Sequence, residues 1–441
     1  MSETVLALIG IVSLIIIMVM IFKKICPVYV TFLLVLMILP FLLGYGFEDL
    51  GTWFADGLAG QANLIGLVIC CVPFFFIQNE LGTYDGVVNF IIKKLGHKPM
   101  LIMVAGWLVA TLGAISANSA AMLMIAVPAL LPLYKRSKIR SAMLATQLAV
   151  MMGPMGLVPW GSPNMYRSSL LGVDGASIYV SSGLCYATIF GYIFGFCTTM
   201  IMGYFEYKRI LSGANDYLLE GLEDGAKAVE RNLTPRQKKM RPVNLLLVLI
   251  LISAFLLNWV NYLVASFILT AVLLVLNYEN ESQMGKIFTK CAPMVLGLMA
   301  CFVAVGGFLQ MFRGTGIIDA LTQLLINAVP DSMMKYLGYI FACVYTPGDF
   351  FLCNTLAVGV MPIVANTIVT AGVCSASAAH AMMMTCANSG VLCCISSANQ
   401  YLLLDMTGVE LKEHVKRTLP LVSLQSIAQA TFLLVAGYAF L

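Results

Sequence analysis

The chain has 441 residues, of which 60% are hydrophobic and only 10% are charged, and its formal net charge is +4. Soluble domains carry about a quarter charged residues. The composition therefore excludes a soluble globular protein and predicts a multi-pass protein of the cytoplasmic membrane, surrounded by lipids. The basic residues are spread over several segments, which argues against a nucleic-acid partner. The 13 cysteines show no metal-ligand spacing and are interpreted as small buried residues.

The first half of the chain is predicted to form five membrane-crossing helices and one re-entrant hairpin. A crossing helix needs about 20 mostly apolar residues. The hairpin is indicated by the small polar stretch GAISANSA (113–120), which lies between two basic clusters, since a hairpin keeps both clusters on the inner side. The acidic segment 48–56 is expected to form a turn. The crossings are expected at Val5–Phe22, Val28–Tyr45, Leu64–Leu81, Ser141–Leu170 and Ile178–Tyr204, and the hairpin at Met100–Leu133.

The second half repeats this order, which predicts an inverted repeat. Residues 1–205 form the first repeat, 206–242 a cytoplasmic linker and 243–441 the second repeat. Because five crossings is an odd number, the two repeats have opposite orientations, as in many secondary transporters. Of the 25 Lys and Arg, all but Arg167, Arg313 and Lys335 then lie in cytoplasmic segments. The crossings are expected at Val243–Leu257, Tyr262–Leu276, Cys291–Met311, Ser375–Leu404 and Leu419–Leu441, with an interfacial helix at Ile317–Val329 and a hairpin at Tyr336–Ala371.

A polar break interrupts one crossing in each half. The first lies in VPWGSPNMYRSSLLGVD (158–174) and the second in ISSANQYLLLDMTGVE (395–410), where Ser and Asn recur at an offset of 235 residues. Pro163 removes a backbone donor and disfavours a continuous helix. The ends of a broken helix expose N–H groups that attract anions and carbonyls that attract cations. The alternative is that these are small-residue seams for helix packing.

Four polar interruptions, at 116–119, 161–164, 346–354 and 396–399, are expected to converge. Serine and asparagine offer neutral donors and acceptors to a small carboxylate. An intramembrane carboxylate is costly unless it has a function, so Asp349 is predicted to carry the coupling cation or proton, with Asn354 beside it; alternatively, that tip reaches outer solvent. Arg167 either pairs with a substrate carboxylate or extends to the interface. The predicted substrate-binding residues are Ser116, Asn118, Ser119, Gly161, Ser162, Asn164, Arg167, Ser396, Ser397 and Asn399.

Nothing in the sequence supports an enzyme, because no catalytic triad, phosphate loop or zinc-binding spacing is found. His380 is expected to be a packed histidine, and Glu80 is expected to end its helix at the inner face. No bound cofactor is expected.

Four motifs resemble the citrate–divalent-metal:proton symporter family of the ion transporter superfamily: LPLYKRSKIRSAMLA (131–145), VPWGSPNMYRSSLLGVD (158–174), GDFFLCNTLAVGVMPIVA (348–365) and LLLDMTGVELKEHVKRTLP (402–420). The resemblance implies proton-driven uptake of citrate chelated to a divalent metal. It also implies that the PWGSP break, Asp349 and the serines before Tyr401 line the site.

Two departures weaken the expectation of a metal–citrate complex. The first hairpin of the family resembles LDGDGTT, whereas this chain has GAISANSA, without acidic residues, and the later break lacks a Leu-Ser-Pro element. We expect a symporter for citrate or a related small organic carboxylate, driven by protons, whose cargo is either the free carboxylate or its complex with Mg²⁺ or another divalent ion. The alternatives are a Na⁺-coupled transporter of another organic anion, or a cation/proton antiporter. A homodimer is compatible with the sequence.

Overall fold

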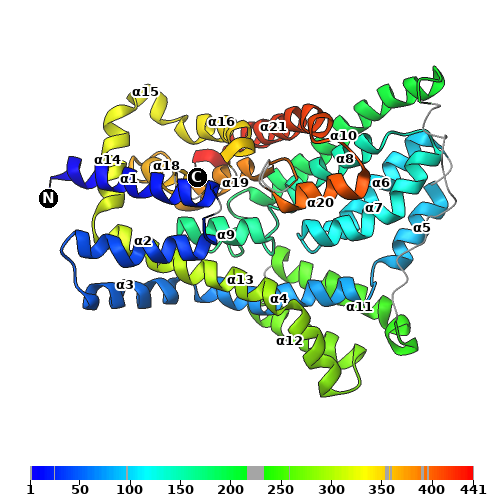
Figure 1. The fold of residues 1–441 in the computed structure, drawn as a ribbon, viewed down its shortest axis with the longest axis horizontal. Coiled ribbons are helices and arrows are strands. Elements are labelled where there is room, and N and C mark those ends of the chain that lie inside the picture. Colours follow the sequence, from blue (N-terminus) through cyan, green and yellow to red (C-terminus); the bar gives the residue numbers. More distant parts are fainter. Residues whose placement is uncertain are drawn as a thin grey trace.

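The computed structural model describes residues 2–23, 25–95, 98–215, 233–257, 259–352, 357, 360–388, 392–394 and 397–440. All regular elements in these ranges are helices (Figure 1). The first half contains α1 (Glu3–Phe22), α2 (Val28–Leu42), α3 (Phe47–Gly60), α4 (Ala62–Glu80), α5 (Asp85–Leu95), α6 (Pro99–Ala114), α7 (Ser119–Arg136), α8 (Ser141–Met155), α9 (Ser162–Leu171) and α10 (Leu184–Leu211).

The second half contains α11 (Pro235–Leu257), α12 (Tyr262–Asn277), α13 (Glu281–Gly314), α14 (Ile317–Ala328), α15 (Asp331–Met334), α16 (Leu337–Leu352), α18 (Met361–Thr370), α19 (Ala376–Met384), the short helix η2 (Thr385–Asn388), α20 (Ala398–Thr407), α21 (Leu411–Val435) and η3 (Tyr438–Phe440). Within the described ranges, α4, α10, α11, α13 and α21 are long and apolar enough to cross a membrane. The prediction of an all-helical, multi-pass membrane protein is therefore confirmed.

Several expected boundaries were wrong. Residues 48–56 form helix α3 rather than a turn, because acidic side chains stabilise a first helical turn and the Asp49 carboxylate accepts a hydrogen bond from Gly46 N at 2.9 Å. Helix α13 begins at Glu281, ten residues early, where the Asn280 side chain accepts from Gln283 N at 3.0 Å. Helix α21 begins at Leu411 rather than at residue 419. The outer parts of the expected linker are helical in α10 and α11, while residues 216–232 lie outside the described ranges.

The first expected crossing break and the expected break in the second hairpin have different outcomes. Helix α8 ends at Met155 and α9 starts at Ser162, so the first crossing is interrupted where the GSPN motif predicted. In contrast, the segment from Thr346 to Leu352 is helical within α16, and Pro347 does not end that helix. Residues 353–356 of that motif lie outside the described ranges.

Two sets of helices at corresponding places in the two halves have matching lengths. Helices α3 and α4, with the single residue between them, span 47–80, and α13 spans 281–314. The first and the last residue of α13 therefore both lie 234 positions after those of the α3–α4 pair. Helices α9 and α20 have 10 residues each. Both end at a glycine in the left-handed region, Gly172 with φ 66° and Gly408 with φ 67°, a conformation that glycine adopts without a steric penalty. These matches are what the predicted repeat would produce.

The long helices of the two halves pack against each other in opposite directions. Glu80 at the end of α4 pairs with Lys290 near the start of α13. Gly57, further back in α3, lies directly against the backbone of Gly306, further along α13. Helices α10 and α21 are also antiparallel, because hydrogen bonds join residue 191 to 425 and residue 187 to 429. Such pairs are the contacts that two inverted halves would make.

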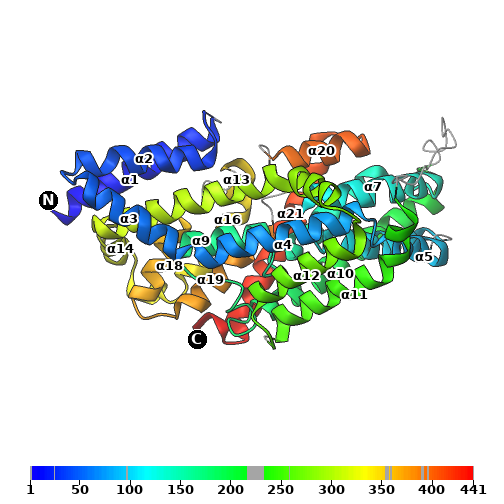
Figure 2. The same ribbon diagram turned by 90° about the horizontal axis from the view of Figure 1, so that it is seen from below.

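Helix α9 lies near the centre of the molecule in both views, between a group formed by α1, α2, α3 and α14 and a group formed by α5, α6 and α7 (Figures 1 and 2). Gln61, the residue between α3 and α4, donates a hydrogen bond from its side chain to Ser169 O in α9 at 3.2 Å. The broken helix is therefore attached to the long helices that cross the molecule.

Candidate functional site

The turn of the first hairpin lies against the first helix break. Residues 115–118 connect α6 to α7, and within this turn Ala117 has a φ of 51°, which is uncommon for a residue with a side chain. The Trp160 indole donates a hydrogen bond to Ile115 O at 2.6 Å. A Cβ at Gly161 would lie 3.4 Å from the Ala117 Cβ. The hairpin turn and the break are thus two sides of one packed unit.

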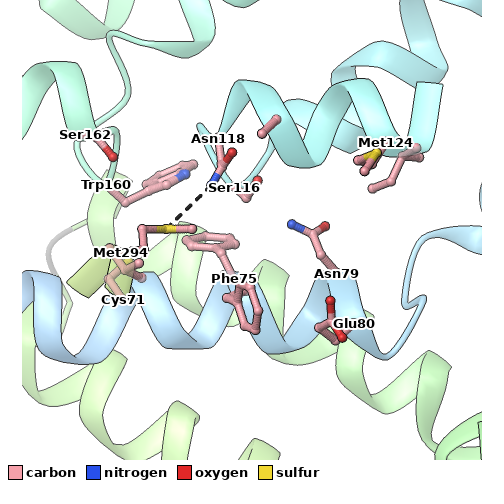
Figure 3. Close-up of a pocket in the computed structure, with 14 residues that line it drawn as sticks. Cys71, Phe75, Asn79, Glu80, Ser116, Asn118, Met124, Trp160, Ser162 and Met294 are labelled. Atoms are coloured by element: carbon pink, nitrogen blue, oxygen red, sulfur yellow. Dashed lines mark hydrogen bonds between the residues drawn. The ribbon is translucent and has the colours of Figure 1, made fainter. Parts of the chain in front are cut away.

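A cavity of about 230 Å³ lies between this unit and the long helices. The hairpin contributes Ser116 and Asn118, and the break contributes Ser162 at the first position of α9. The Asn118 side chain donates across the cavity to Met294 Sδ in α13 at 3.5 Å (Figure 3). The remaining lining residues are Cys71, Val72, Phe75, Phe76, Asn79, Glu80, Ala120, Met124, Ile125 and Trp160. We refer to this space as the Ser116 cavity.

The wall opposite the hairpin carries oxygen acceptors from α4. The Asn79 Oδ1 atom is buried and has no hydrogen-bond partner among the described residues. Glu80 lines the cavity and pairs at its edge with Lys290 of α13. In Figure 3 the Asn79 side chain points from α4 towards the hairpin. Glu80 ends α4, as expected. Its place in the cavity wall was not predicted, because two polar residues at the end of an apolar helix are also typical of a helix that ends at the membrane surface.

The lining therefore offers two kinds of chemistry. Hydroxyl and amide groups from the hairpin and the break can donate to carboxylates. Carboxylate and amide oxygens from α4 are the ligands that divalent hard cations take. Among the described residues, no group of three or more His, Cys, Asp or Glu side chains lies close enough together to hold a metal ion. A divalent ion in this cavity would accordingly need most of its ligands from its own chelator or from water.

The Asn164 side chain stabilises the break between α8 and α9 and does not line the Ser116 cavity. Its amide donates to Leu157 O at 2.9 Å, a carbonyl left without a helical partner where α8 ends. Its oxygen accepts from the Ser168 hydroxyl at 3.1 Å, and that hydroxyl lies 3.0 Å from His380 Nε2. His380 is fully buried, which agrees with the expectation of a packed histidine.

Arg167 also lies away from the Ser116 cavity. Its side chain is only 3% exposed, so it does not extend to an interface. It donates to the Tyr345 hydroxyl at 3.2 Å, and its guanidinium carbon lies 5.6 Å from the centre of the Tyr345 ring. A buried guanidinium requires such partners. Arg167 thus joins α9 to α16 of the second hairpin.

The second break has a different register from the one expected. Because α9 and α20 begin and end 236 residues apart, Gln400 rather than Asn399 takes the place of Asn164. The Gln400 oxygen accepts from Cys394 N at 2.6 Å, so it too binds the backbone just before its helix. Asn399 is half-buried in α20. The predicted offset of 235, which came from matching Ser and Asn in the two motifs, is one residue less than the 236 residues that separate α9 from α20.

The remaining predicted residues are placed as follows. Ser119 is buried at the start of α7, Gly161 and Ser397 precede α9 and α20, and none of them lines the Ser116 cavity. Asp349 lies in α16, where the structure describes its backbone but not its side chain. Asn354 and Ser396 lie outside the described residues. Of the ten predicted substrate-binding residues, the Ser116 cavity brings together Ser116, Asn118 and Ser162.

Comparison with known proteins gives matches over most of the chain. A family model described as "Citrate transporter" matches residues 4–387. A citrate transporter of Bacillus subtilis (strain 168) is 26% identical over 415 residues, covering 94% of this chain and 95% of the relative. The Mg(2+)/citrate complex secondary transporter of the same organism is 26% identical over 439 residues, covering 98% of each.

One solved structure shows the fold. The YdaH transporter of Alcanivorax borkumensis, described as having an unusual topology, superposes with a TM-score of 0.59 and covers 90% of each chain. Its sequence identity is 14%, so this likeness concerns the arrangement of helices alone.

Proposed function

Because this chain belongs to the citrate transporter family, we propose that it moves citrate across the membrane as a complex with a divalent cation, driven by protons. Family membership makes the chain a transporter rather than an enzyme. The named relatives support both parts of the cargo, since one is called a citrate transporter and another a Mg(2+)/citrate complex secondary transporter.

The observation that carries the proposal is the two-sided lining of the Ser116 cavity. Ser116, Asn118 and Ser162 offer donors to citrate carboxylates and to its hydroxyl group. Asn79 and Glu80, on the opposite wall, offer oxygens to the metal face of the same complex. The acidic residues missing from the first hairpin are thereby replaced by a carboxylate from α4. Mg²⁺ binds few protein ligands and keeps several waters, so one carboxylate and one amide are sufficient.

The transport cycle that we propose uses two inverted repeats, 1–205 and 243–441, joined by the linker 206–242. The antiparallel packing of α3 and α4 on α13 supports this division. Alternating access in such proteins is a movement of one bundle against another around a fixed site near the midplane. The Ser116 cavity lies between the hairpin–break unit and the long helices, where such a movement would open or close it.

Proton coupling is assigned in this proposal to Asp349, with Asn354 beside it. Asp349 follows Tyr345 by four residues in α16, so the two positions share a face of that helix. Tyr345 is the residue that accepts a hydrogen bond from Arg167 of the broken helix α9. A change of charge at position 349 would thus occur close to the contact between the second hairpin and the first break.

Uptake of radiolabelled citrate into proteoliposomes tests the function. We expect uptake to require Mg²⁺ and an inward proton gradient, and to be unaffected by Na⁺. A double variant, Ser116→Ala with Asn118→Ala, is expected to lose uptake, whereas Ser212→Ala, at an exposed hydroxyl near the end of α10, is expected to retain it. Uptake of free citrate driven by Na⁺ alone would overturn the proposal in favour of the Na⁺-coupled alternative.

A further inference from the structure

A second cavity lies at the other end of α9. Its volume is about 210 Å³, and its lining includes Leu170, Gly172, Leu309, Arg313, Ile318 and Asn366. The Ser116 cavity begins at Ser162, the first residue of α9, whereas this one is reached at the last turn. A helix of 10 residues separates them, which is about 15 Å at 1.5 Å per residue. We refer to the second space as the Arg313 cavity.

Arg313 is the charged residue in this lining. Its side chain is exposed, and the described residues provide it with neither a hydrogen bond nor an ion pair. Its Nη2 atom lies 2.9 Å from the point where a Cβ would stand on Gly172, so the glycine leaves room for the guanidinium at the end of α9. Asn366 adds an amide that is held by a hydrogen bond to Thr322 Oγ1 at 2.7 Å. The cavity thus combines one cationic fork and one amide with walls that are mostly apolar side chains.

The two cavities also correspond through the repeat. Helix α13 follows the α3–α4 pair by 234 residues at both ends, and at this offset Leu309 corresponds to Phe75 and Arg313 to Asn79. Phe75 and Asn79 line the Ser116 cavity, and Leu309 and Arg313 line the second one. The second arms of the two hairpins, α7 and α18, contribute to the respective cavities as well. In each half, this long helix and the second arm of the hairpin thus line a space at one end of α9, the Ser116 cavity at its start and the Arg313 cavity at its end.

We propose that the Arg313 cavity is a second binding site for the transported carboxylate, which the anion occupies at the opposite end of α9 from the Ser116 cavity. An arginine fork matches a carboxylate in shape and charge and binds it through two parallel hydrogen bonds. This inference rests on the proposed function, since it assumes that the transported species is an anion. The competing role for Arg313 is structural: it stabilises the carbonyl end of α9, which favours a cation.

Equilibrium binding of radiolabelled citrate with Mg²⁺ to the purified protein distinguishes the two roles. At saturation we expect two citrates for each wild-type chain and one for each Arg313→Gln chain. Arg313→Lys is expected to retain the second citrate at lower affinity. The matched control is Lys286→Gln, the same change of charge at the exposed, opposite end of α13, which should still bind two.

Transport gives an independent readout. In proteoliposomes, Arg313→Gln is expected to raise the KM for citrate about tenfold, as for loss of one charge-assisted hydrogen bond, while the maximal rate stays within about twofold. The second site would be overturned if the wild-type chain bound one citrate and Arg313→Gln changed only the thermal stability. The proposed function would then remain intact. Absence of citrate binding to the wild type, in either cavity, would instead overturn the proposed function itself.

Discussion

The Trp160 indole donates a hydrogen bond to the Ile115 carbonyl at 2.6 Å and thereby joins the first helix break to the turn of the first hairpin. The same ring stacks on Phe75 with 5.7 Å between ring centres, so one side chain connects the hairpin, the break and α4. All three parts supply walls of the Ser116 cavity. This contact therefore sets the shape of the candidate site without carrying any of its polar groups.

Trp160→Phe is expected to keep the stacking and remove the donor. The Ile115 carbonyl would lose its partner in a partly buried position, which costs about 1 kcal/mol of unfolding free energy. We therefore expect a lower Tm in detergent and a raised KM for citrate. Trp160→Ala, which also removes the ring, should lower the Tm further. Identical Tm and KM for wild type and Trp160→Phe would show that the hydrogen bond does not hold the two segments together.

The contact between the long helices allows a test of how closely the two halves approach. A Cβ on Gly57 would overlap the Gly306 backbone, whereas a Cβ on Gly51, in the same helix, would meet nothing within 4 Å. Gly57→Ala is expected to destabilise the protein by about 1–3 kcal/mol through overpacking. Gly51→Ala is expected to stabilise it by up to about 1 kcal/mol, because alanine favours a helix. Thermal unfolding of both variants checks the opposite signs; equal shifts would contradict the close approach.

The order of the elements was predictable from sequence because it depends on local signals. Apolar runs predicted the apolar helices, of which α4, α10, α11, α13 and α21 are long enough to cross a membrane among the described residues. The Gly-Ser-Pro-Asn motif placed the first break between α8 and α9. Acidic residues at the start of α3 were misread as a turn, since the same residues favour either a loop or the first turn of a helix. Matching Asn164 to Asn399 predicted an offset of 235 between the two broken helices, one residue less than the offset between α9 and α20. The error arose because Gln400, which occupies the position of Asn164, has a different side chain.

The composition of the candidate site was only partly predictable. Ser116, Asn118 and Ser162 could be named because small polar residues are unusual in apolar segments. Asn79 and Glu80 could not, because nothing within α4 indicates that its end faces the hairpin turn. For Arg167, sequence left open a substrate contact or an interfacial position, and the buried contact with Tyr345 depends on the packing of α9 against α16.

Arg167 and Tyr345 are expected to be energetically coupled. Tyr345→Phe removes the hydroxyl that accepts from Arg167, a hydrogen bond to a charged group in a buried position. Such bonds are worth about 1.5–3 kcal/mol. We expect a double-mutant cycle of Tyr345→Phe and Arg167→Gln to give a coupling energy of about 0.5–3 kcal/mol, the range found for residues in contact. Additive changes in unfolding free energy would mean that the contact contributes little.

Glu80 is predicted to determine how citrate binding depends on Mg²⁺. Glu80→Gln keeps the size of the side chain but removes the charge that a divalent ion prefers, so the apparent affinity for Mg²⁺ in the presence of citrate should fall roughly tenfold. Lys290→Gln, which removes the partner of Glu80, should have the opposite effect, because the carboxylate is then free to bind the metal. Thermal stabilisation by citrate, measured across a Mg²⁺ titration, separates the two. An unchanged Mg²⁺ dependence in Glu80→Gln would place the metal elsewhere.

Asp349→Asn is predicted to abolish proton-coupled uptake while the protein still reaches the membrane. An asparagine at this position in α16 has nearly the same shape as aspartate but cannot take up or release a proton. Citrate binding to the purified variant should persist, because the Ser116 cavity is lined by other elements. The matched control is Asp319→Asn, at an exposed carboxylate of α14, which should transport as the wild type does. Uptake driven by a proton gradient at wild-type rates in Asp349→Asn would mean that the coupling proton is carried by a different group.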